Sequence, residues 1–125
     1  MMKITYTEPT DEDRIRLISE KYTKEHQWRK LIEEVNELIE ELGRGYPPDE
    51  GFLTEAVDVA IMVKQVVNQH GKNDEFNAEM RYKLFRQVER MNQEGLLSVN
   101  EYANYRAQGD EWEELIERME REDEQ

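Results

Sequence analysis

The sequence of 125 residues contains no cysteine, which excludes disulfides, thiolate zinc sites and cysteine nucleophiles. It contains two histidines, so a histidine-rich metal site is not expected. No apolar run approaches the length of a membrane span, and residues 1–10 lack the apolar core of a signal peptide. These absences lead us to expect a soluble, cytoplasmic protein.

Basic residues are also few: Lys and Arg total 17 against 30 Asp and Glu, for a formal net charge of -13. Affinity for nucleic-acid polymers depends on neutralising phosphates with Lys and Arg, so this class of partner is excluded. An anionic membrane surface is excluded for the same reason. A small polyanionic ligand stays possible if metal ions bridge the like charges.

Hydrophobic residues make up 37% of the chain and charged residues 38%, a lean composition for a globular protein. The apolar residues nevertheless recur at spacings of three and four, which is typical of helices that pack together. We therefore predict one all-α domain over residues 1–125, a bundle of five to six helices. Because so small a core needs further cover, we expect a homodimer or a dimer of dimers.

Caps and stripes place the expected helices. The first helix is expected to begin at Thr10-x-x-Asp13, and the second carries an apolar stripe from Trp28 to Leu42. Further helices are expected over 51–69, from 73 or 74 to 92, after Ser98 and after Asp110. The segment 51–69 is apolar nearly all round, which predicts burial on most sides. We expect Lys3 to Thr7 to form a short extended arm and the tail from Glu117 to fray.

Two acidic patterns stand out within these helices: E-E-x-x-E at 33–37 and E-x-x-D at 55–58. Residues three or four apart share a helix face, so each pattern presents converging oxygens, the ligands that Mg²⁺ prefers. The patterns are common in this chain, however, since E-E-x-x-E recurs at 113–117 and E-x-x-D at 8–11 and 120–123.

Context favours the first pair of patterns. Asp58 lies between Val57 and Val59 in the most apolar segment, and a buried unpaired carboxylate must be neutralised, paired or bound to metal. A structural ion pair with Arg or Lys is the alternative. The acids from Glu113 to Asp123 alternate with basic residues opposite an ordinary apolar stripe, which indicates a solvated face.

These two patterns, separated by 17 residues between Glu37 and Glu55, resemble the MazG-like all-α nucleoside triphosphate pyrophosphohydrolases. The stretches HQWRKLIEEVNELIEEL, TEAVDVAIMVKQ and YKLFRQVERM strengthen the resemblance, which covers residues 25–92 as a catalytic core. Residues 96–125 lie outside it as a C-terminal helical extension. Asn36 and Val57 depart from the pattern, because the family often has a small residue at these places.

The resemblance implies Mg²⁺-dependent hydrolysis of an NTP or dNTP to nucleoside monophosphate and pyrophosphate, with Mn²⁺ as a substitute metal. It implies that Glu34, Glu37, Glu55 and Asp58 are metal ligands. Glu33 would be a further ligand or would orient the attacking water, so Glu33 and Glu34 are the expected catalytic residues.

Basic and polar residues beside the acids are candidates for contact with the nucleotide. Lys30 shares the acidic flank of its helix, and Lys83 and Arg86 form a basic line on a later helix; all three could bind phosphate. For Lys83 and Arg86 the alternative is a solvated face paired with Glu79 or Glu89. Gln27 precedes the acidic helix and could touch the base or sugar.

Two other functions fit the same composition. The first is an acidic helical interaction protein without chemistry, which does not account for Glu55 and Asp58 inside an apolar helix. The second is a non-catalytic regulator that binds a nucleotide or metal without turnover.

Overall fold

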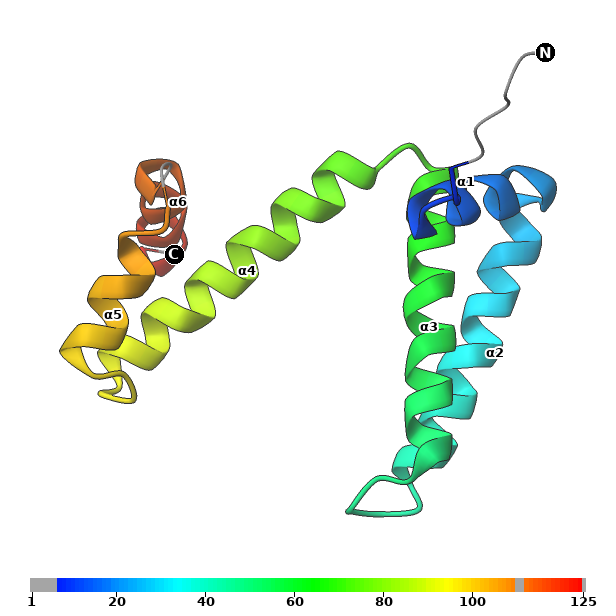
Figure 1. Ribbon diagram of the computed structural model, residues 1–125, viewed down its shortest axis with the longest axis horizontal. Coiled ribbons are helices and arrows are strands. Elements are labelled where there is room, and N and C mark those ends of the chain that lie inside the picture. The colour runs from blue at the N-terminus through cyan, green and yellow to red at the C-terminus, as the bar shows by residue number, and fades with distance from the viewer. Residues whose placement is uncertain (1–6, 110–111, 125) are drawn as a thin grey trace, which may run out of the picture. The chain divides into compact units, whose positions relative to one another are not determined.

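The computed structural model describes residues 7–109 and 112–124, which form six helices and no strand (Figure 1). The all-α prediction is confirmed. The helices are α1 (Asp11–Lys21), α2 (Lys24–Leu42), α3 (Glu50–Gln69), α4 (Asn73–Gln93), α5 (Val99–Arg106) and α6 (Trp112–Asp123). Within the described ranges, no helix combines the length and apolar character needed to cross a membrane.

The chain divides into two compact units, residues 1–73 and residues 74–125. The first unit holds α1, α2 and α3, and the second holds α5, α6 and all of α4 after its first residue. The expectation of a single domain stays a prediction.

Side-chain caps fix several helix starts where the sequence predicts them. Thr10 accepts a hydrogen bond from the backbone N–H of Asp13, whose carboxylate accepts one from the backbone N–H of Thr10, both at 3.1 Å. Ser98 and Glu101 repeat this reciprocal arrangement at the start of α5. Such caps satisfy backbone donors that lack partners in the first helical turn. The expected cap at Asp110 lies outside the described residues, as does the expected arm except for Thr7.

In the first unit, α2 and α3 lie side by side and run antiparallel, with α1 against α3 (Figure 1). Hydrogen bonds join the end of α3 to the end of α1. Asn68 Nδ2 donates to Ser19 Oγ at 2.6 Å, and Gln69 Nε2 donates to the carbonyl oxygens of Ser19 and Tyr22 at 2.8 and 2.9 Å. These bonds hold α1 at the end of the α2–α3 pair where α2 begins.

The contact between α2 and α3 includes buried polar side chains. Gln27 of α2 hydrogen-bonds Gln65 of α3, and both side chains are buried. Further along the antiparallel pair, Glu37 lies near Glu55. Glutamates and glutamines therefore occupy positions where two helices usually bury apolar side chains.

The apolar stripe of α2 remains largely exposed. Its members recur at spacings of three and four and are between 37 and 58% exposed: Trp28, Ile32, Val35, Ile39 and Leu42. On α3, Leu53, Val57 and Ile61 are also exposed and lie along one side of the helix. Met62, Gln65 and Val66 are buried and most other positions of the helix are half-buried, which agrees with the predicted burial on most sides.

The second unit has its own small core of Tyr82 and Phe85 from α4 and Met119 from α6. Glu122 accepts a hydrogen bond from the hydroxyl of Tyr82 at 2.5 Å and one from Arg118 Nε at 3.3 Å. In the described part of the tail, α6 continues to Asp123, contrary to the expected fraying, because Met119 and Glu122 join the end of α6 to α4.

Candidate metal centre

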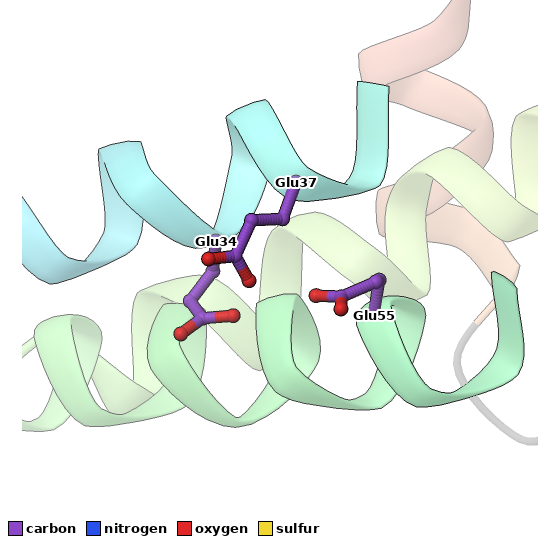
Figure 2. Close-up of side chains that lie close together, drawn as sticks. All are labelled: Glu34, Glu37 and Glu55. Carbon is purple, nitrogen blue, oxygen red and sulfur yellow. The ribbon is translucent and has the colours of Figure 1, made fainter. Parts of the chain in front are cut away.

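Three glutamates converge between α2 and α3. Glu34 and Glu37 extend from α2 toward Glu55 on α3 (Figure 2). One carboxylate oxygen from each residue lies within 4.8 Å of the others. Glu34 and Glu37 lie one turn apart on α2 and Glu55 lies on α3, so the cluster combines the two acidic patterns of the sequence.

Glu34 is the buried member of this cluster, with 8% of its surface exposed. Its Oε2 has no hydrogen-bond partner among the described residues, and the same holds for Oε2 of Glu55. A buried carboxylate oxygen without a partner is costly, because the charge loses its hydration without gaining a replacement. Protons or a bound cation would therefore stabilise the cluster.

The pKa values of the cluster follow from this burial. Loss of hydration raises the pKa of Glu34 above its ordinary value of 4.5, and the charges of Glu37 and Asp58 add to the rise. Burial likewise raises the pKa of Glu55, and the hydrogen bond and negative charge of Glu37 raise it further. Each effect disfavours the ionised form, so a bound cation would relieve all of them at once.

Asp58 is half-buried on α3, one turn beyond Glu55. It lies outside the set of three oxygens within 4.8 Å, yet its charge is close enough to raise the pKa of both Glu34 and Glu55. The sequence points to Asp58 as the buried acid, whereas the structure buries Glu34 most deeply. Four of the expected ligands thus share one region, with Glu34 at its most desolvated point.

Lys30 lies beside the cluster and contacts two of the expected site residues. Its Nζ is 3.3 Å from Glu33 Oε2 and 3.7 Å from Glu34 Oε1. The hydrogen bond from Lys30 to Glu33 and the charges of both glutamates raise the pKa of Lys30, so the ammonium form is favoured. Glu33 itself is exposed and lies outside the three-glutamate cluster.

Gln27 is 2% exposed, and its Nε2 donates to Oε1 of Gln65. Its own Oε1 lies 3.0 Å from Nδ1 of His26, which fits an Nδ1–H donor on that ring. The side chain is therefore engaged inside the helix pair, and its contact with a base or sugar stays a prediction.

The basic line lies in the second unit, on α4. Lys83 is exposed, while Arg86 is partly buried and pairs with Glu122 at 3.5 Å. Arg86 also lies 5.6 Å from the centre of the Tyr82 ring, in a cation–π contact. The partner of Arg86 is thus neither Glu79 nor Glu89, and its phosphate role stays a prediction, as does that of Lys83.

The acidic repeat of the last helix has a different environment. Glu113, Glu114 and Glu117 are exposed on α6, and so are Glu120 and Asp123. This agrees with the interpretation of that repeat as a solvated face.

The sequence analysis assigned no role to two residues of α3 that lie on the same helix face as Glu55 and Asp58. Gln65 pairs with Gln27, and Gly51 leaves room for Glu41, since a Cβ there would lie 2.6 Å from Glu41 Oε2. That oxygen is also buried without a hydrogen-bond partner in the described part of the chain. The spacing from Gly51 through Glu55 and Asp58 to Gln65 follows one helix face, which is the signal that would have found them.

Comparison of the chain with family models, curated proteins and solved structures found no match.

Proposed function

We propose that this protein is an Mg²⁺-dependent nucleoside triphosphate pyrophosphohydrolase, with Mn²⁺ as a substitute metal. The observation that supports the proposal best is the buried, unpartnered Oε2 of Glu34 beside Glu37 and Glu55. An all-carboxylate donor set suits a hard divalent cation, and such cations are held together with substrate phosphates. The resemblance of the two acidic patterns to the MazG-like family supplies the reaction.

In this proposal Glu34, Glu37, Glu55 and Asp58 hold the metal, which supplies charge neutralisation for the phosphates and a more acidic water. Water hydrolyses the phosphoanhydride bond between the α- and β-phosphates, and the products are a nucleoside monophosphate and pyrophosphate. Such reactions need mainly positioning and neutralisation of charge.

The residues beside the ligands have their own parts in the proposed reaction. Lys30, held in its ammonium form by Glu33 and Glu34, neutralises a phosphate oxygen at the edge of the cluster. Glu33 is exposed next to Lys30, where its carboxylate can orient the attacking water. For Lys83 and Arg86, which belong to the second unit, phosphate contact stays a prediction from the sequence.

A panel of canonical NTPs and dNTPs, assayed with Mg²⁺ for pyrophosphate and monophosphate, tests the proposal. Pyrophosphate is expected from at least one of them, and release of orthophosphate alone would contradict the reaction. Mg²⁺-dependent thermal stabilisation without turnover would favour the non-catalytic regulator, because a ligand that binds the folded state raises its stability. Neither stabilisation nor turnover would favour the interaction protein.

We also propose that the working form is a homodimer or a dimer of dimers. The exposed stripe from Trp28 to Leu42 and the exposed Leu53, Val57 and Ile61 form apolar faces on the two helices that carry the acids. Pairing of such faces between copies would remove them from water, and closed symmetric assembly is the usual way to do so.

A further inference from the structure

A hollow of about 570 Å³ lies beside the three-glutamate cluster, at the start of α2. It is lined in part by Tyr22, His26, Arg29, Lys30 and Glu33. Its volume falls in the range of small-molecule sites, which is roughly 300–1,000 Å³. Lys30 belongs both to this hollow and to the cluster, because its Nζ contacts Glu34 as well as Glu33. The hollow and the candidate metal centre are therefore adjacent.

The rings of Tyr22 and His26 form a stacked pair in this hollow. Their centroids are 4.7 Å apart and their planes differ by 11°. Both side chains are exposed, Tyr22 to 51%, so the pair presents ring surface to the solvent. A planar heterocycle can extend such a stack, since every nucleobase has a face that stacks on aromatic side chains.

Hydrogen bonds hold the His26 ring in place from behind. Its Nδ1 lies 3.0 Å from Oε1 of the buried Gln27, which is itself bound to Gln65. With Nδ1 engaged in this way, Nε2 of the neutral ring is the remaining acceptor. The buried pair of Gln27 and Gln65 thus orients the exposed ring of His26.

The charged residues that line the hollow balance, with Glu25 and Glu33 against Arg29 and Lys30, so the lining carries no excess of positive charge to hold a phosphate by itself. Glu25 and Glu33 both line it, and their carboxylates repel an anion that no metal bridges. Arg29 is exposed and offers guanidinium donors to the carbonyl and ring-nitrogen acceptors of a base. From His26 to Glu34 the helix rises roughly 12 Å, which leaves Lys30 midway between the stacked pair and the cluster.

We infer that this hollow is the base subsite of the nucleotide: the base stacks on the His26–Tyr22 pair and receives hydrogen bonds from Arg29. Lys30 then lies at the α-phosphate, and the remaining phosphates reach the glutamates. This inference rests on the proposed function, because the phosphates direct the base toward this end of α2.

Calorimetric titration in Mg²⁺ with the four nucleoside 5′-monophosphates and with ribose 5-phosphate tests the inference without turnover. The ligands share sugar and phosphate and differ in the base. At least one monophosphate should bind about tenfold more tightly than ribose 5-phosphate, as base–aromatic stacking predicts. His26→Ala and Tyr22→Ala should each reduce this preference severalfold, and His26→Phe should largely keep it, because a ring remains.

Tyr46→Ala and His70→Ala are matched controls, since both residues are exposed and neither lines the hollow. They should keep the wild-type preference. The inference is overturned if no ligand binds or if the wild type shows no preference for a base. It is also overturned if Tyr22→Ala and His26→Ala both keep the preference and circular dichroism shows that both variants are folded. Pyrophosphate release in the panel assay together with any of these results would remove the base subsite and leave the hydrolase proposal standing.

Discussion

Gln27 and Gln65 hydrogen-bond to each other through their side-chain amides, across the buried interface of α2 and α3. They occupy one end of a polar line that continues to Glu37 and Glu55, whereas the apolar stripe of α2 remains in solvent. Polar side chains are thus buried between these two helices, which carry both a candidate metal centre and an exposed apolar surface.

This amide pair predicts a non-additive effect on stability. Gln65→Leu should lower the free energy of unfolding by about 1–3 kcal/mol, because it leaves the buried amide of Gln27 without its acceptor. The double variant Gln27→Leu with Gln65→Leu should recover much of that loss, since both partners become apolar. Urea unfolding of Gln27→Leu, Gln65→Leu and the double variant measures the coupling, and additive losses would contradict the paired arrangement.

The raised pKa values of Glu34 and Glu55 predict how stability depends on pH without metal. Because their folded pKa values lie above the ordinary 4.5, the folded state binds more protons in the interval between the two values. Their contribution to stability is present below pH 4.5 and is lost as pH rises through the raised pKa values. The metal-free protein should therefore become more stable as pH falls from neutral toward 4.5, as followed by urea unfolding at several pH values.

Glu34→Gln should flatten this dependence, and Glu113→Gln, an exposed change of the same type, should not. The pKa values of Asp13, Glu101 and Glu122 are lowered, so these three groups make the protein less stable as pH falls. They lose their stabilising effect only below their ordinary pKa values, and this lies outside the pH range between neutral and 4.5. An equal slope in Glu34→Gln and wild type would show that the cluster is not the source.

Substitution of the proposed ligands should abolish hydrolysis while the fold persists. Glu34→Gln and Asp58→Asn each remove a charged oxygen with little change of shape, so turnover should fall by at least about 100-fold and apparent Mg²⁺ affinity should fall with it. Asp58→Asn should also stabilise the metal-free protein, because it removes a charge that repels Glu55.

The acidic repeat of α6 provides the matched controls for these variants. Glu113→Gln and Asp123→Asn change exposed residues and should leave turnover near the wild-type value. Turnover and Mg²⁺ dependence are to be measured for all four variants in one buffer. Damage from Asp123→Asn equal to that from Asp58→Asn would undermine the choice between the two acidic motifs.

The exposed stripe of α2 predicts that one charge can dissociate the assembly. Ile39, 58% exposed in the single chain, would be buried between copies, so Ile39→Glu should weaken association by about tenfold or more. Leu96→Glu, at a position 64% exposed in the second unit, is the control. Light scattering at micromolar concentration should show a dimer or tetramer for the wild type and the control. A wild-type monomer would refute the proposed assembly.

Helix positions were predictable from the sequence because they depend on local interactions. Thr10 and Ser98 accept hydrogen bonds from backbone groups three residues away, so their caps can be recognised without knowledge of the fold. The alignment of Glu34 and Glu37 on one face follows in the same way from the period of the helix. Local patterns do not show whether contacts with another helix stabilise the end of a helix. The helix α6 continues to Asp123 because Met119 and Glu122 contact α4.

The meeting of the acids depended on the tertiary structure. The sequence supplied two acidic helices, but the antiparallel register of α2 and α3 decided that Glu37 faces Glu55 and that Glu34, rather than Asp58, is buried most deeply. Register follows from the packing of side chains far apart in the chain, such as Gln27 with Gln65, and no period within one helix encodes it. For the same reason the sequence could mark the apolar stripe of α2, while only the packed structure shows that this stripe faces away from α3.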